Sequence, residues 1–255
     1  MAEPVLQVTD LTKRYTKKGG AEMVAVDSAT FTVAPGECVG LVGGSGCGKS
    51  TIAQMVTRLI EPSSGSVVLN GRDITSVRGA DLRAVAKDVQ MVFQNPTSSF
   101  DPRRTLGYGI AESLRNFGMR KTEARLRAAD LLVKCGLPAD FADRYPREVS
   151  GGQCQRAAIA RALALNPPLV ICDEATSALD VTVQAQIVSL LNDLRKECGT
   201  AYLFICHDLG LVQGFCDRVI VMQAGKIVEE GPTNDVIARP QHPYTRQLLD
   251  AVLAV

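Results

Sequence analysis

Short runs of mainly apolar residues recur along most of the chain. Each is about five residues long, rich in Val and Ile, and does not alternate between apolar and polar positions. Such runs are typical of strands that are covered on both faces, as in a parallel sheet between helices. They are CVGLV (38–42), VQMVF (89–93), PLVIC (168–172), YLFIC (202–206) and RVIVM (218–222).

Segments with helical periodicity separate these runs, and strand–helix alternation predicts an α/β core. We expect helices over 49–60, 105–118, 121–135, 152–165 and 181–197. The first 35 residues alternate more and predict a small antiparallel sheet at one edge. The stretch from about 95 to 150 lacks buried-strand runs and predicts a helical insertion. Two short helices separated by prolines should close the chain.

Composition narrows the class of protein. The 255 residues include 28 Lys and Arg against 27 Asp and Glu, and 46% are apolar. That balance does not fit a disordered chain, and a net charge of +1 supplies no global field for nucleic acid. No apolar run reaches the ~18 residues that a membrane-spanning helix needs, and the first residues show no signal-peptide pattern. The eight cysteines form no CxxC pair, which favours reduced, mostly buried thiols.

The strand at 38–42 runs directly into GGSGCGKST, which fits the phosphate-loop pattern GxxxxGK[ST]. Glycines let the backbone approach a phosphate closely, and the following helix directs its N-terminus at the anion. Lys49 should reach the β- and γ-phosphates of ATP, and Ser50 should ligate Mg²⁺. The alternative is a glycine-rich turn that happens to precede a helix. The predicted nucleotide-binding residues are Gly43, Gly44, Ser45, Gly46, Cys47, Gly48, Lys49, Ser50 and Thr51.

An acidic pair, Asp173 and Glu174, ends the run LVICDE (169–174). Ligand groups of an open parallel sheet lie at the carboxyl ends of its strands. We therefore expect Asp173 to hold Mg²⁺ through water and Glu174 to polarise a water that attacks the γ-phosphate. Without the phosphate loop, an ordinary acidic strand end would be the better interpretation.

The segment VSGGQCQRAAIARAL (149–163) resembles the LSGGQ signature of ATP-binding-cassette (ABC) ATPases, with Val149 in the position of the usual Leu. The resemblance covers essentially the whole chain and implies a P-loop NTPase core, an N-terminal antiparallel β subdomain and a helical subdomain. It places the core at about 1–94 and 166–255 and the helical subdomain at about 95–165. The implied reaction is ATP hydrolysis with Mg²⁺, coupled to transport.

The same resemblance assigns further residues. Tyr15 matches the aromatic residue that stacks on adenine, Gln94 matches the glutamine that senses Mg²⁺ and the attacking water, and His207 matches the switch histidine. SALD (177–180) matches the loop after the acidic pair. Ala175 stands where many cassettes have Pro, which removes no ligand.

The signature implies a second anion site. The Ser150 hydroxyl, the Gly152 N–H and the helix N-terminus, together with Gln153, would close on the γ-phosphate of ATP that is bound to another cassette. The resemblance therefore implies a dimer, a homodimer or a heterodimer with a second ABC ATPase, that closes with ATP and opens after hydrolysis.

Two segments resemble importers of oligopeptides, dipeptides or nickel: QNPTSSFDPRRTLGYGIAESL (94–114) and HPYTRQLL (242–249). This resemblance implies two membrane permeases and an extracytoplasmic solute-binding protein as partners, with the chain on the cytoplasmic face of the membrane and no nucleic acid. The run 199–222 and the absence of a cysteine-containing tail favour nickel or a metal–chelator complex slightly over peptide. The alternative is a non-transport cassette, such as a subunit of a phosphonate-breakdown complex.

Cys47 lies inside the phosphate loop, two residues before Lys49. A thiol at a helix N-terminus beside a cation is typically reactive. We therefore expect Cys47 to be alkylated early and MgATP to protect it, with Cys154 as the main competing site.

Overall fold

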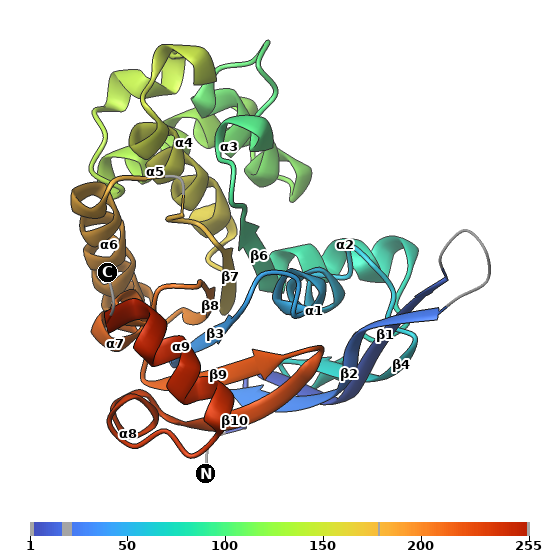
Figure 1. Ribbon diagram of the computed structural model, residues 1–255. Coiled ribbons are helices and arrows are strands. Elements are labelled where there is room, and N and C mark those ends of the chain that lie inside the picture. The colour runs from blue at the N-terminus through green and yellow to red at the C-terminus, as the bar shows by residue number, and fades with distance from the viewer. Residues whose placement is uncertain (1–2, 17–21, 178, 254–255) are drawn as a thin grey trace.

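A computed structural model describes residues 3–16, 22–177 and 179–253. Two sheets and a group of helices make up the fold (Figure 1). The larger sheet has the strand order β10-β9-β3-β8-β7-β6 and is parallel except for the antiparallel β10. Its strands are β3 (Cys38–Gly43), β6 (Val89–Val92), β7 (Leu169–Asp173), β8 (Ala201–Ile205), β9 (Arg218–Gln223) and β10 (Lys226–Pro232).

The five predicted buried strands are confirmed as β3 and β6 to β9, with bounds that shift by at most one residue. Each residue of β3, β7 and β8 is buried, as expected for strands covered on both faces. Alternate residues of β3 belong to different cores: Cys38 and Val42 pack on the helical side, whereas Val39 and Leu41 face the second sheet. The sheet therefore separates two hydrophobic cores.

The smaller sheet is antiparallel, as predicted from the first 35 residues, and has the order β2-β1-β4-β5. The strands β4 and β5, which follow α1 in the chain, were not predicted to contribute to it. Helix α1 lies between the two sheets and completes the second core (Figure 1). The bounds are β1 (Leu6–Thr16), β2 (Glu22–Val33), β4 (Ser64–Leu69), β5 (Arg72–Asp73) and α1 (Lys49–Val56).

The segment after β6 is helical, as expected, and its helices pack on one another away from the smaller sheet (Figure 1). They are α3 (Leu106–Asn116), α4 (Lys121–Lys134) and α5 (Gly151–Ala162), with 3-10 turns at Thr97–Ser99, Ala139–Asp143, Pro146–Glu148 and Leu163–Leu165. The exact subdomain boundaries near 95 and 165 stay a prediction.

The remaining helices are α2 (Gly79–Asp88), α6 (Val181–Cys198), α7 (Leu209–Phe215), α8 (Thr233–Ala238) and α9 (Pro243–Leu253). The closing pair α8 and α9 matches the prediction. Helices α2 and α7 were not predicted, because α2 buries only Val85 and α7 is seven residues long. In the part of the chain that the structure describes, no helix combines the length and the apolar character needed to span a membrane.

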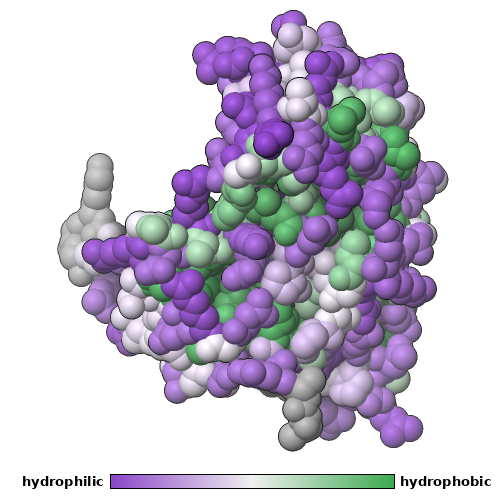
Figure 2. All heavy atoms as spheres, turned by 180° about the vertical axis from the view of Figure 1, so that it is seen from behind, coloured by the Kyte–Doolittle hydropathy of each residue, from purple (hydrophilic) through white to green (hydrophobic). Residues whose placement is uncertain are grey.

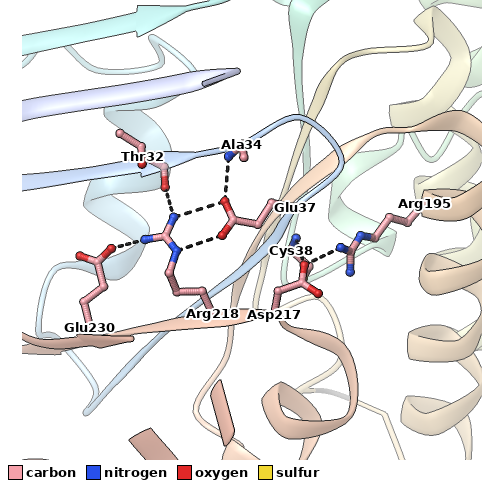
Figure 3. A network of polar contacts seen from close by, with 8 residues as sticks. All are labelled: Thr32, Ala34, Glu37, Cys38, Arg195, Asp217, Arg218 and Glu230. Atoms are coloured by element: carbon pink, nitrogen blue, oxygen red, sulfur yellow. Dashed lines mark hydrogen bonds and ion pairs between the residues drawn. The ribbon is translucent and has the colours of Figure 1, made fainter. Parts of the chain in front are cut away.

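One edge of the larger sheet carries a polar network at the start of β3 and β9 (Figure 3). Arg218 at the start of β9 donates to the Glu37 carboxylate at 2.9 Å, and it also contacts Glu230 on β10 and the Thr32 carbonyl on β2. Next to it, Asp217 accepts from the Cys38 N–H at 2.9 Å and pairs with Arg195 of α6. The network joins both sheets and α6 at this edge.

Candidate functional site

The loop between β3 and α1 has the backbone shape that its glycines predict. Gly43, Gly46 and Gly48 have φ angles of 153°, 76° and 109°, in a region that side chains with a Cβ rarely adopt. A Cβ at Gly48 would lie 2.4 Å from the Ala25 carbonyl oxygen. The loop therefore needs these glycines, and it leads into α1 at Lys49 with its backbone close to the helix N-terminus.

Lys49 is folded back onto its own loop. Its Nζ donates to the carbonyl oxygens of Gly43 at 2.7 Å and Gly44 at 3.0 Å, and it lies 3.8 Å from the Cys47 Sγ. Only 5% of Lys49 is exposed. A cation is thus held beneath the loop by two carbonyl oxygens, at the position from which it can reach an anion bound above.

The acidic pair meets the loop at the carboxyl edge of the parallel sheet. The Ser50 hydroxyl donates to Asp173 Oδ1 at 2.9 Å. Burial raises the pKa of Asp173, the neighbouring Glu174 charge adds to the rise, and the Ser50 hydrogen bond opposes it. The buried Asp173 carboxylate and the Ser50 hydroxyl are oxygen ligands of the kind that Mg²⁺ prefers, and a bound cation would compensate the charge of the carboxylate.

Glu174 is held in an uncommon backbone conformation, with φ at 48°. Its N–H donates to the Ile205 carbonyl of β8 at 2.9 Å, and Gln94 Nε2 donates to its Oε2 at 2.8 Å. A positive φ in a residue with a long side chain costs energy and is found at functional sites more often than elsewhere. The structure therefore brings Gln94 and Glu174 together, although they are 80 residues apart.

A hollow of about 410 Å³ lies over the loop and includes most of the predicted residues. Tyr15 lines it from β1, with 36% of the residue exposed. Met23, which pairs with Tyr15 across the β1–β2 ladder, and Ala25 also line it and were not predicted. The pairing of Met23 with Tyr15 depends on the register of β1 with β2, which shifts along the ladder and leaves no signal in the sequence pattern. The other lining residues are Ser45, Gly46, Gly48, Lys49, Ser50, Thr51, Gln94 and Glu174.

His207 follows β8 and is exposed beside the site. It shares a small pocket of about 20 Å³ with Glu174, Ser177 and Asp208. The structure thus places His207 next to the predicted catalytic carboxylate. Of the SALD segment, residue 178 lies outside the described residues, and Asp180 caps α6 by accepting from the Val183 N–H at 3.0 Å.

Ser150, Gly152 and Gln153 do not line the hollow. They begin α5, where Ser150 Oγ accepts from the Gln153 N–H at 3.3 Å and Gln153 Oε1 accepts from the Ser150 N–H at 2.8 Å. This reciprocal pair is a capping box. A Cβ at Gly152 would lie 2.7 Å from Val183 Cγ1 of α6, so the helices approach closely there. The signature residues are exposed or half-buried at a separate place on the surface.

Three predicted loop residues, Gly43, Gly44 and Cys47, do not line the hollow. Cys47 is 6% exposed, and its sulfur lies under the loop between Gly43 and Lys49. This burial argues against the expectation that Cys47 is alkylated early, and the left-handed glycines on either side turn its side chain inward. Cys154 is also buried, and burial raises the pKa of its thiol. Seven cysteines are buried as expected, and only Cys198 is exposed.

Comparison with known proteins identifies the family. The family model described as "ABC transporter" matches residues 26–177, more than half of the chain and the part that contains the loop, the signature and the acidic pair. The chain belongs to the ABC transporter family. A second model, "Oligopeptide/dipeptide transporter, C-terminal region", matches residues 228–255 of this ATPase.

Two relatives illustrate the similarity. The "Glutathione import ATP-binding protein GsiA" of Pectobacterium atrosepticum is 48% identical over 258 residues, which cover 98% of this ATPase and 41% of that protein. The "Probable peptide ABC transporter ATP-binding protein y4tS" of Sinorhizobium fredii is 48% identical over 258 residues, which cover 98% of this ATPase and 73% of that protein. This ATPase therefore spans about two fifths of the length of GsiA.

Solved structures show the same fold. The ATP-binding cassette MJ0796, solved as a dimer in a post-hydrolysis state with ADP and Pi, has a TM-score of 0.82 and 31% identity, over 89% of this ATPase and 98% of that chain. The cbiO1 protein from Clostridium perfringens, part of the ABC transporter complex cbiONQ, has a TM-score of 0.82 and 27% identity, over 93% and 92%. The predicted ABC ATPase fold is confirmed.

Proposed function

We propose that this ATPase binds MgATP in the hollow over its phosphate loop and hydrolyses it to power an importer. The observation that carries the proposal is the convergence of a cation, a hydroxyl–carboxylate pair and an amide–carboxylate pair at one edge of the sheet: Lys49, Ser50 with Asp173, and Gln94 with Glu174. Tyr15, which lines the same hollow and is 36% exposed, would stack on the adenine ring.

The roles follow from position. The loop N–H groups and Lys49 would hold the phosphates, and Ser50, Asp173 and Gln94 supply oxygen atoms that suit Mg²⁺. When bound, Mg²⁺ would neutralise charge on the phosphates. In the described residues no cluster of three or more His, Cys, Asp or Glu could hold a metal, which fits an ion that takes most of its ligands from nucleotide and water.

Glu174 would accept a proton from the attacking water. Its hydrogen bond from Gln94 orients the carboxylate, and the Ile205 carbonyl holds its backbone at the end of β7. His207 shares a small pocket with Glu174, and it would contact the γ-phosphate or the attacking water. This division of roles matches general-base catalysis by a positioned carboxylate.

The signature residues support the proposal of a dimeric active unit. The N–H groups at the start of α5 and the exposed Ser150 hydroxyl lie apart from the hollow of the same chain and would form a surface that binds an anion. A second cassette, identical or homologous, would bring this surface to the γ-phosphate. The relative MJ0796 was solved as a dimer.

The cargo that the relatives favour is a small peptide. GsiA is named for glutathione, itself a tripeptide, and y4tS for peptide. The C-terminal match to the oligopeptide/dipeptide model includes the HPYT segment. Nickel or a metal–chelator complex, which the sequence favoured slightly, and a non-transport role receive no specific support. We therefore propose a peptide-class importer.

Permease subunits are the proposed membrane partners. A cavity of about 650 Å³ opens between β6, α2 and α3, and it includes the exposed apolar residues Leu59 and Phe93. On the face that Figure 2 shows, apolar side chains gather across the middle, whereas the upper part is mostly hydrophilic. A permease segment in this cavity would contact Phe93, which directly precedes Gln94, the hydrogen-bond donor to Glu174. A solute-binding protein would deliver the cargo to the permeases.

The variant Glu174→Gln tests the function. It should keep ATP affinity within about twofold, because the amide fills the same space, and reduce turnover by about 10²- to 10⁴-fold. Glu123→Gln, on the exposed face of α4, is the matched control and should hydrolyse ATP at the parent rate. Near-normal turnover by Glu174→Gln would contradict the assignment. Copurification with membrane permeases tests the importer role, and a stable complex with soluble metabolic enzymes instead would overturn it.

A further inference from the structure

The C-terminal helix α9 reaches the phosphate loop. The Gly44 N–H donates a hydrogen bond to the Tyr244 hydroxyl oxygen at 2.8 Å, across a separation of 200 residues. A Cβ at Gly44 would lie 2.9 Å from that oxygen, so glycine is what lets the hydroxyl approach the backbone this closely. Neither Gly44 nor Tyr244 lines the nucleotide hollow.

The hydrogen bond acts on a peptide group that also holds Lys49. The Gly44 N–H belongs to the same peptide unit as the Gly43 carbonyl, which accepts from Lys49 Nζ at 2.7 Å. One planar group is thus bound by the Tyr244 hydroxyl at its N–H and by the Lys49 ammonium at its oxygen. Rotation of this peptide group would move both partners, so Tyr244 fixes the direction in which the Gly43 carbonyl holds Lys49.

Tyr244 is itself held by several contacts. Its ring, with Leu248 and Leu249, packs on the core beneath the sheet. At the start of α9, the Glu229 carboxylate on β10 accepts from the Gln241 N–H at 2.7 Å and the His242 N–H at 3.0 Å. Glu229 therefore fixes the position of the first turn of α9 against β10, and with it the hydroxyl of Tyr244.

We propose that Tyr244 is a positioning residue for nucleotide binding, which acts through the Gly43–Gly44 peptide on the resting position of Lys49 and on the shape of the phosphate loop. The proposal deepens the proposed function, because it assumes that the loop binds ATP. Through this peptide, helix α9 in the C-terminal region would influence how the phosphate loop binds nucleotide.

The expected effect of removing the hydroxyl is moderate. Tyr244→Phe keeps the ring and its packing and leaves the Gly44 N–H to water. A single neutral hydrogen bond corresponds to about two- to tenfold in an equilibrium constant. We expect the Kd for ATP and the KM to rise together by that factor, while kcat stays within twofold, because Glu174 and Asp173 are not affected. A general loss of folding would instead lower kcat and the unfolding temperature.

Two further variants sharpen the test. Glu229→Gln weakens the contact that positions α9 and should raise the Kd in the same direction by less. Gly44→Ala introduces a methyl group 2.9 Å from the hydroxyl and should also raise the Kd. In the double variant with Tyr244→Phe, the two increases should combine to less than their product, because both act on one contact.

Tyr202→Phe is the matched control. Its hydroxyl is buried in β8 and has no hydrogen-bond partner among the described residues. Loss of this hydroxyl should leave the Kd and the KM unchanged. If Tyr244→Phe also binds ATP as the parent does, or if it lowers kcat at an unchanged KM, the proposal is overturned.

Amide hydrogen exchange separates this proposal from the function on which it rests. In the nucleotide-free full chain, the Gly44 amide should exchange about tenfold faster in Tyr244→Phe than in the parent, while the amides of β3 are unchanged. Equal exchange at Gly44 would contradict the contact itself. Faster exchange in a protein that binds no ATP would keep the contact and reject the nucleotide site.

Discussion

The two edges of the parallel sheet differ in how their polar groups are satisfied. At the amino edge, where the strands begin, Arg218 has partners on β2, on β10 and at Glu37 (Figure 3). At the carboxyl edge, Asp173 has one hydroxyl donor and a raised pKa, and Glu174 has a positive φ angle. Both edges are formed by the same strands. The charged groups of the amino edge are paired with one another, whereas those of the carboxyl edge are arranged to bind a ligand.

The contrast is visible within single strands. β3 begins at Cys38, whose N–H is bound by Asp217, and ends at Gly43, whose φ angle of 153° opens the phosphate loop. Charged side chains at the amino edge form ion pairs. At the carboxyl edge Lys49, Asp173 and Glu174 bind backbone carbonyls, a hydroxyl and an amide instead of one another. We therefore expect changes at the amino edge to lower stability, and changes at the carboxyl edge to lower activity without loss of stability.

The largest effect should come from the carboxyl edge. Lys49→Met removes the buried cation and should lower ATP turnover by about 10²- to 10³-fold, as expected for loss of a charge aimed at the transition state. The unfolding free energy should not fall, since the two carbonyls that hold Lys49 can bind water. Steady-state hydrolysis and urea unfolding measure both. Lys87→Met, on the exposed face of α2, is the control; a large loss of stability in Lys49→Met would contradict the comparison.

At the amino edge the expected change is in stability. Arg218→Met leaves the Glu37 and Glu230 carboxylates unpaired, with their side chains 17% and 33% exposed. We expect a loss of about 2–4 kcal/mol in unfolding free energy, somewhat below the cost of breaking a fully buried ion pair. ATP affinity of the folded fraction should be unchanged. Arg125→Met, in an ion pair that is 71% exposed on both sides, should cost little.

Asp173→Asn should raise stability by about 0.5–2 kcal/mol while it abolishes turnover. Because the folded-state pKa of Asp173 is raised, its ionised form is disfavoured in the nucleotide-free protein. Ionisation of Asp173 in the folded state therefore lowers the free energy of unfolding. This loss is absent below the ordinary Asp pKa of about 4, grows as the pH rises from there to the raised pKa, and then stays constant. Unfolding followed from pH 4 to 8 should show this growing advantage of the variant. A variant less stable than the parent at pH 7 would reject the argument.

The smallest effect concerns the cysteines. Brief treatment with a thiol-alkylating reagent should label Cys198, which alone among the eight cysteines is exposed and lies at the end of α6, near the start of β8 and so away from the carboxyl edge. ATP turnover should stay within experimental error of the untreated protein. Peptide mapping identifies the labelled residue. Early labelling of Cys47 that MgATP prevents would show that the loop opens more than the structure indicates.

Much of the fold could be predicted because its signals are local. Buried strands such as β7 and β8 are continuous apolar runs, and the phosphate loop carries its glycines and Lys49 in sequence. The burial of Cys47 could not be predicted, since it depends on the backbone rotation at Gly46 and Gly48. Contacts between distant segments, such as Gly44 with Tyr244, leave no periodic signal. Glu174 was predicted from its place at the end of an apolar run and Gln94 from the family resemblance, and only the structure shows that the two side chains touch.

The buried position of Lys49 has a consequence for anion selectivity. The Lys49 ammonium donates to the Gly43 and Gly44 carbonyl oxygens, so an anion at the loop must compete with both of them for it. A ligand with several linked phosphates brings more oxygen atoms to that exchange than a single phosphate does. We therefore expect inorganic phosphate and nucleoside monophosphates to compete poorly with ATP, which lets the cassette distinguish nucleotides by chain length in a cell rich in free phosphate.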